Sequence, residues 1–149
     1  MSGYLLDTNI CIHLLNGDFN LAEKVEQVGL ANCFISELTI AELLYGVAGS
    51  APDRQTRNRQ NLDKFLRLFP RSHRLPISDA LEIYAEQKAH LKRIGRLQGE
   101  FDLLIGCTAL AHGLTLATRN TRHFTDLQGI QLENWIDDVT GTVAAPPSP

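Results

Sequence analysis

Short apolar runs alternate with longer amphipathic segments along most of this 149-residue chain, and that alternation restricts the possible folds. The runs with the length of buried strands are 4–6, 33–35, 74–77, 114–118 and 130–132. Helical periodicity predicts helices over 10–15, 21–28, 37–47, 54–69, 79–94 and 101–112. Such an order is typical of an α/β fold, a short parallel β-sheet flanked by helices on both faces.

The chain is predicted to form one domain over residues 1–139, since no linker or internal repeat divides it. Residues 140–149 are small, rich in proline and uncharged, and are predicted to be a disordered tail. Three cysteines, an odd number set far apart among apolar neighbours, favour a reducing compartment. With no run long enough to span a bilayer and no signal-peptide pattern, we expect a cytoplasmic protein that has no contact with membrane.

The net charge of −3 argues against a protein that coats nucleic acid, but the charges are unevenly placed. Seven arginines and lysines lie between positions 54 and 74, opposed only by Asp53 and Asp63. A solvated helix face accounts for such a run. The functional interpretation is a rim that contacts phosphate groups.

Four polar residues stand against apolar stretches: Asp7, Glu42, Asp102 and Asn120. Carboxylates are rarely buried without a partner, and three gathered together would repel one another unless a cation held them. Oxygen ligands of this kind suit Mg²⁺ or Mn²⁺, which most often serve phosphate chemistry. Because sites in parallel sheets form beyond the carboxyl ends of strands, Asp7 and Asn120 are well placed by sequence.

Each of these residues also has a purely structural explanation. Asp7 can cap the helix that follows it, and Asn120 can begin a turn. Glu42 completes a capping box with Thr39, unless Ser36 is the cap and Glu42 falls in the second turn. Asp102 lies where the positive end of a helix dipole favours a carboxylate.

Taken together and in order, the motifs resemble the PIN-domain family, specifically the VapC-type toxins of bacterial toxin–antitoxin pairs. The segments that carry the resemblance are LLDTN at 5–9, ISELTIAEL at 35–43, DLLIGCTA at 102–109, GLTLATRNTRHF at 113–124 and LENW at 132–135. They span nearly the whole chain. Many relatives have aspartate where this chain has Asn120, and that difference lowers the charge of the expected site.

The resemblance implies a Mg²⁺- or Mn²⁺-dependent endoribonuclease that hydrolyses phosphodiester bonds in a structured RNA such as tRNA or rRNA. Asp7, Glu42 and Asp102 would hold the metal, with Asn120 as the fourth catalytic position. Thr8 and Thr118 would support the ligands by hydrogen bonds. The residues expected to contact RNA are Arg57, Arg67, Arg119 and Arg122.

The resemblance also implies a small cognate antitoxin as partner, and a homodimer or a toxin–antitoxin hetero-oligomer. Apolar positions within 10–15 and 43–47 offer a surface for the antitoxin. One alternative is a catalytically inactive PIN scaffold that binds RNA or a protein partner. A second is a receiver-like or phosphatase-like protein using Asp7 as phosphate acceptor, although Asn9 stands where such a phosphatase needs a second aspartate.

Overall fold

All five strands of the computed structural model, which describes residues 3–138, form one parallel sheet in the order β3-β2-β1-β4-β5. The strands are β1 (Tyr4–Leu6), β2 (Cys33–Ser36), β3 (Arg74–Leu75), β4 (Thr115–Ala117) and β5 (Gln131–Glu133). The helices are α1 (Thr8–Leu15), α2 (Leu21–Val28), α3 (Glu37–Ala48), α4 (Gln55–Leu66), α5 (Leu81–Arg93) and α6 (Glu100–Ala111). The predicted α/β class is therefore confirmed.

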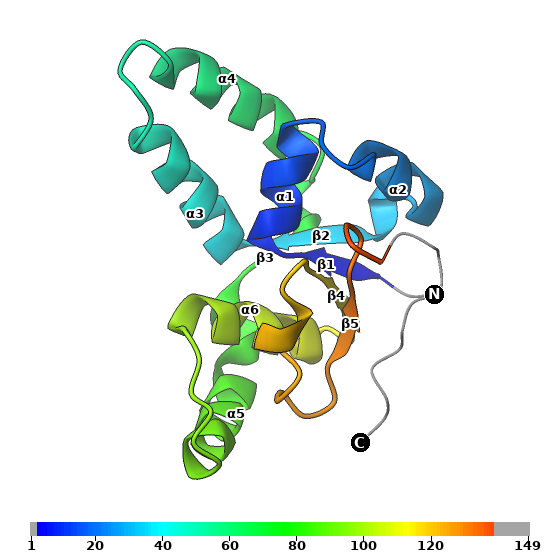
Figure 1. Cartoon of the computed structure of the whole chain (residues 1–149), viewed down its shortest axis with the longest axis vertical. Helices are drawn as coiled ribbons and strands as arrows, with labels where there is room; N and C mark the ends of the chain where they lie inside the picture. The colour runs from blue at the N-terminus through cyan, green and yellow to red at the C-terminus, as the bar shows by residue number, and fades with distance from the viewer. Residues whose placement is uncertain (1–2, 139–149) are drawn as a thin grey trace.

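Helices cover both faces of the sheet, with α1 to α4 on one side and α5 and α6 on the other (Figure 1). Neighbouring leucines of β1 show how the strand serves both layers. Leu6 packs into the core beneath α1 to α4, whereas Leu5 packs into the core that includes α6. Because successive strand side chains point to opposite faces, a buried parallel strand is apolar at every position.

The direction of the strand order reverses between β1 and β4. The chain moves outward from β1 through β2 to β3, and then returns across the sheet to β4. Leu6 pairs with Ala117, so the residues that follow, Asp7 and Thr118, leave the sheet side by side. Such a reversal of strand order is where α/β sheets bind their ligands.

Several predicted segments differ from the structure at their ends. The strand expected over 74–77 ends at Leu75, because Pro76 interrupts it and a 3₁₀ helix follows at Ile77–Ala80. That helix also delays the start of α5 to Leu81. The helix expected over 54–69 is shorter at both ends, Gln55–Leu66. The predicted tail at 140–149 and the domain boundary at 139 lie outside the described residues.

The end of α6 and its packing follow from glycine. Gly113 has a φ of 63° just beyond the helix, the left-handed conformation that ends a helix without steric cost. Inside α6, a Cβ on Gly106 would lie 2.4 Å from Leu127 and 3.2 Å from Phe124. The absence of a side chain there allows the segment after β4 to pack against α6 and Asp102.

Candidate active site

The buried carboxylate of Asp7 lies at the centre of the candidate site. Asp7 follows β1, caps α1 and is only 4% exposed. Its Oδ1 accepts from the backbone N–H of Thr8 at 2.8 Å, and its Oδ2 accepts from Thr118 Oγ1 at 2.8 Å. The capping role expected from sequence is real, but it uses only one of the two oxygens.

Burial raises the pKa of Asp7 to about 6, although the hydrogen bonds from Thr118 and Thr8 act in the opposite direction. The negative charges of Asp102 and Glu42 raise this pKa further. The structure therefore brings the three carboxylates of the sequence prediction within electrostatic reach of one another. A bound cation would reverse the shift, since it favours the ionised form.

Glu42 reaches the site from the second turn of α3. Ser36 caps this helix, with its Oγ accepting from the backbone N–H of Leu38 at 3.0 Å. The capping-box alternative for Glu42 is therefore wrong, because Thr39 lies inside the helix. Instead, Thr8 Oγ1 donates to Glu42 Oε1 at 2.6 Å, which links the start of α1 to α3.

Asp102 occupies the first turn of α6, near the positive end of the helix dipole. Its side chain is 41% exposed, and its nearest basic partner is His123, with Nδ1 3.7 Å from Oδ2. No side chain caps α6, so the N–H groups of its first turn face the same region as Asp102.

Asn120 joins the site through its backbone. Its N–H donates to Thr118 Oγ1 at 3.1 Å, and its side chain caps no helix. The backbone turns there, at φ −100° and ψ 55°, into the 3₁₀ helix Thr121–His123. Thr118 therefore connects the Asn120 turn to Asp7 through a single hydroxyl group.

Asn9 is a member of the site that the sequence did not single out for this role. Its Nδ2 lies 3.4 Å from Asp7 Oδ2 and 3.3 Å from Thr118 Oγ1. Its Oδ1 accepts from the backbone N–H of Arg119 at 3.1 Å. Thr39 is another, because its Oγ1 lies 3.0 Å from Thr8 Oγ1. The only feature of the sequence that pointed to Asn9 was the polar triplet at 7–9, and helix capping also explains that triplet.

The four arginines predicted to contact RNA occupy different settings. Arg57 and Arg67 are exposed along α4. Arg119 is held by Asp137 at 3.2 and 3.3 Å and lies 5.2 Å from the centre of the Phe19 ring. Arg122 is exposed and lines a cavity of about 410 Å³ together with Asp102.

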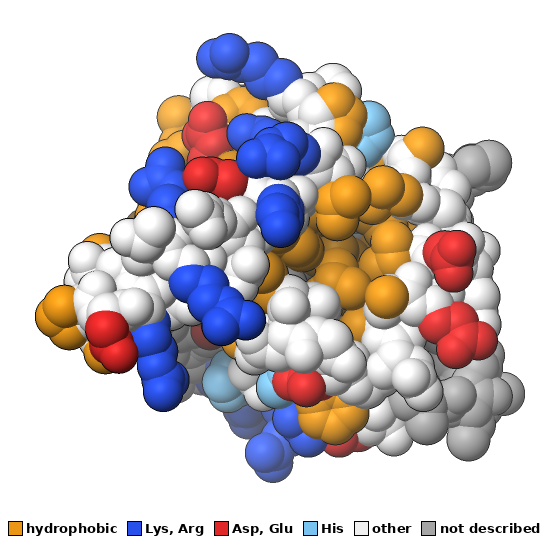
Figure 2. Space-filling model, turned by 90° about the horizontal axis from the view of Figure 1, so that it is seen from above, with side chains coloured by type: hydrophobic (Ala, Val, Ile, Leu, Met, Phe, Trp, Pro, Cys, Tyr) orange, Lys and Arg blue, Asp and Glu red, His pale blue; other side chains and the backbone are white. Residues whose placement is uncertain are grey.

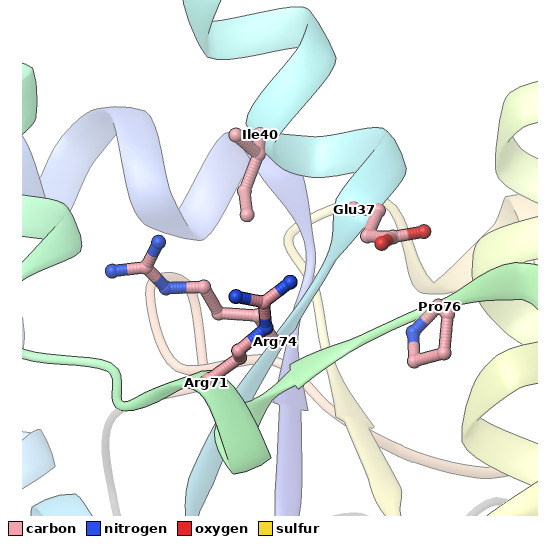
Figure 3. A pocket seen from close by; sticks show the side chains of 5 residues that line it. All are labelled: Glu37, Ile40, Arg71, Arg74 and Pro76. Atoms are coloured by element: carbon pink, nitrogen blue, oxygen red, sulfur yellow. The ribbon is translucent and has the colours of Figure 1, made fainter.

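A second basic cavity, of about 820 Å³, lies at the β3 edge and is lined by Glu37, Ile40, Arg71, Arg74 and Pro76. Arg74 donates to the carbonyl oxygens of Phe69 and Leu66, at 2.8 and 2.6 Å, and so satisfies the end of α4. Figure 3 shows the carboxylate of Glu37 directed away from both guanidinium groups. The basic segment of the sequence thus serves partly to hold α4 in place.

The chemistry of the donor set suits a hard divalent cation. Carboxylate and amide oxygens are the ligands of Mg²⁺ and Mn²⁺, and Mg²⁺ commonly binds through one or two carboxylates while keeping several waters. Among residues 3–138, no three Asp, Glu, His or Cys side chains stand close enough to hold an ion without rearrangement. The burial of Asp7 and the negative charges of Asp102 and Glu42 raise the pKa of Asp7, and a bound cation would relieve this effect.

The fold and the candidate site together define an α/β domain with an acidic site at the carboxyl ends of its parallel strands. A family model described as the PIN domain matches residues 4–130, and the chain belongs to that family. Ribonuclease VapC2 of Rickettsia felis is 36% identical over 138 residues, covering 89% of this chain and 97% of its own. The tRNA(fMet)-specific endonuclease VapC of Shigella flexneri is 32% identical, covering 91% and 99%.

Solved structures agree with this assignment. The chain matches DNA-bound VapBC from Salmonella typhimurium with a TM-score of 0.81 and 29% identity, covering 91% of this chain and 99% of that one. It matches VapBC2 from Rickettsia felis, bound to a DNA fragment from its promoter, with a TM-score of 0.78 and 31% identity. The latter match covers 89% of this chain and 98% of that one.

Proposed function

We propose that this protein is a metal-dependent endoribonuclease that acts as the toxin of a toxin–antitoxin module. The observation that carries the proposal is the buried carboxylate of Asp7, raised in pKa beside Glu42 and Asp102 where the strand order reverses. Relatives named as VapC ribonucleases cover nearly the whole chain, and two are named as tRNA(fMet)-specific endonucleases. The receiver-like and phosphatase-like alternative loses its basis, because the chain belongs to the PIN-domain family.

Asp7, Glu42 and Asp102 would hold Mg²⁺ or Mn²⁺, with Asn120 contributing its amide oxygen directly or through water. The ion, when bound, would lower the pKa of a water and stabilise the negative charge that develops on the phosphate. Thr8 keeps Glu42 beside α1, while Thr118 and Asn9 fix the orientation of Asp7. These contacts prepare the carboxylates before the substrate arrives.

The substrate class is RNA, with a structured cellular RNA such as tRNA or rRNA as the target. Arg122 beside Asp102 and the exposed Arg57 and Arg67 on α4 would contact phosphate groups. Arg119, paired with Asp137, would instead stabilise the turn that precedes Asn120. We expect a cytoplasmic protein, since the proposed substrate is cellular RNA. Within residues 3–138 there is no helix capable of crossing a bilayer.

A groove between α1, α3 and α4 is the expected docking surface for the antitoxin. Its cavity is about 330 Å³, with apolar walls from Ile12, Leu15, Leu43, Val47 and Leu62. Glu42 also lines this groove, so a bound chain would lie next to the acidic site. On this helical side of the molecule, hydrophobic side chains gather beside a row of Lys and Arg (Figure 2). Solved relatives are VapBC complexes, which favours a toxin–antitoxin hetero-oligomer, and a homodimer is the other assembly expected.

The test is to incubate the purified protein, freed of antitoxin, with total cellular RNA in Mg²⁺, in Mn²⁺ and in EDTA. We expect discrete cleavage that depends on the metal and is lost in Asp7→Asn. End-mapping of the products would identify the target RNA. A folded protein that neither binds metal nor cleaves RNA would instead favour the inactive scaffold that binds RNA or protein.

A further inference from the structure

A cavity adjoins Asp102, and neither Asp7 nor Glu42 lines it. The 410 Å³ cavity there is formed by the loop before α6 and by the 3₁₀ helix after β4. Its walls are Arg96, Leu97, Gln98, Gly99, Asp102, Arg122, His123 and Asp126. Because Asp102 belongs to both places, anything bound in the cavity lies next to the reacting phosphate.

The cavity offers several groups that bind a phosphate. Arg122 forms no ion pair with any residue between 3 and 138, so its guanidinium is available to an anion. Arg96 stands 3.7 Å from Asp126, a long and exposed contact that a phosphate could replace. His123 adds a ring N–H, and the uncapped amino end of α6 adds backbone N–H groups and the positive end of its dipole.

Gln98 supplies a hydrogen-bond acceptor, whereas the groups described above are donors. Its Oε1 is buried and has no hydrogen-bond partner. Among the buried side-chain nitrogen and oxygen atoms of residues 3–138, it is the only one without a partner. An unpaired buried acceptor destabilises the folded protein, because the acceptor has lost its hydrogen bonds to water without replacing them. The residue itself is only partly buried and lines the cavity, so a rotation of its amide group would bring Oε1 to face the cavity. A phosphate oxygen cannot satisfy this acceptor, whereas an O–H or N–H donor can.

The chemistry of the walls decides which donor fits. His123 is the one aromatic side chain among the lining residues, and no Phe, Tyr or Trp offers a nucleobase a larger ring on which to stack. Leu97 is the apolar wall, and the other lining residues are polar, charged or glycine. A sugar–phosphate unit fits this arrangement better than a base does, and the only donor that it carries is the ribose 2′-hydroxyl.

We propose that this cavity binds one ribose–phosphate unit of the RNA, with Arg122 and Arg96 on the phosphate and Gln98 Oε1 accepting from the 2′-hydroxyl. The subsite deepens the proposed function, since it rests on RNA being the substrate. It explains how a metal-dependent phosphodiesterase distinguishes RNA from DNA without reading the base. The contact involves no sequence-specific group, so it acts on any RNA strand that enters the site.

The experiment compares two probes that differ only in the 2′-hydroxyl: fluorescent 12-mers of uridine and of 2′-deoxyuridine. Both are titrated with the full chain carrying Asp7→Asn, which binds without cleaving. We expect tighter binding of the ribo-oligomer. Adding Gln98→Met, which keeps the length of the side chain but removes the acceptor, should weaken ribo-oligomer binding about fivefold and leave the deoxy-oligomer unchanged. Gln98→Glu, which keeps an acceptor, should retain a preference for the ribo-oligomer.

Arg122→Ala provides the matched contrast. It should weaken the binding of both probes equally. It should also reduce the slope of log K against log salt concentration by about 0.7, which is the contribution of one phosphate contact on a single strand. Gln98→Met should leave the salt dependence unaltered. Equal affinity for the two probes, or a preference that survives Gln98→Met, would overturn the proposal. Because this assay measures binding alone, a failure to cleave cellular RNA would count against the proposed function and not against the subsite.

Discussion

The hydroxyl of Thr118 donates to Oδ2 of Asp7 at 2.8 Å and joins two strand ends that are 111 positions apart in the chain. Thr118 Oγ1 also accepts a hydrogen bond from the backbone N–H of Asn120 at 3.1 Å. One threonine therefore positions the central carboxylate and the turn that carries the fourth predicted site residue. This connection is possible because β1 and β4 are neighbours in the sheet.

Thr118→Val should test this connection, since it keeps the shape of the side chain and removes the hydroxyl. The hydrogen bond from Thr118 lowers the pKa of Asp7, so its loss should raise that pKa. Metal binding should then weaken, because less of the carboxylate is ionised. We expect cleavage or metal affinity to fall by about 10- to 100-fold. The measurements are kcat, KM and the metal concentration that gives half-maximal activity.

Thr108→Val is the matched control for that substitution. Thr108 is also buried, and its hydroxyl donates to the carbonyl of Leu104 at 2.8 Å within α6. It makes no contact with Asp7, so its loss should leave the metal requirement unchanged. An equal loss of activity in both variants would assign the effect to packing.

Asp7 should make the metal-free protein less stable as pH rises. Its pKa is about 6 in the folded protein and 3.8 as a free side chain, so the folded state retains the proton longer. The free energy of unfolding should therefore fall between about pH 4 and pH 6, by about 3 kcal/mol at most. Asp7→Asn should lack this decrease and be the more stable protein in EDTA at pH 7.5, although inactive.

Urea unfolding of both proteins in EDTA, at pH 4.5 and at pH 7.5, measures this difference. Contributions from other titrating groups cancel in the comparison. Mg²⁺ should then stabilise the wild-type protein more than Asp7→Asn, because a cation favours the ionised carboxylate. Parallel pH profiles for the two proteins would contradict the raised pKa.

Asn120→Asp should tighten metal binding. A fourth carboxylate adds negative charge to the site, and we expect the metal concentration for half-maximal activity to fall on the order of tenfold. Gln60→Glu adds the same charge on an exposed position of α4 and is the control. An unchanged metal requirement in Asn120→Asp would show that the side chain of residue 120 does not face the ion.

Gly106→Ala should destabilise the fold near Asp102. The new Cβ would lie 2.4 Å from Leu127 and 3.2 Å from Phe124, so the segment after β4 must shift. We expect a loss of about 1–3 kcal/mol in the free energy of unfolding. At Gly46, inside α3, nothing lies within 4 Å of the added Cβ. Gly46→Ala should stabilise the protein by about 0.5–1 kcal/mol, and thermal unfolding of both variants compares them.

Local patterns in the sequence predicted most of the secondary structure, because periodicity and capping depend on residues only a few positions apart. Where two local patterns competed, the sequence could not choose between them. Both Ser36 and Thr39 are good caps for α3, and only the end of β2 at Ser36 decides which one is used. The strand expected over 74–77 is present but shorter for a related reason, since it ends at Leu75, just before Pro76.

The sequence by itself determined the α/β class and singled out Asp7, Glu42 and Asp102, since these depend on residue type, spacing and family motifs. Only the tertiary structure brought in Asn9, whose contact with Thr118 spans 109 positions, and Thr39, whose contact with Thr8 spans 31. The lack of a hydrogen-bond partner for Gln98 Oε1 likewise depends on how the chain packs around the start of α6. Hydrogen bonds between distant segments depend on how the strands are ordered, and no local pattern encodes that order.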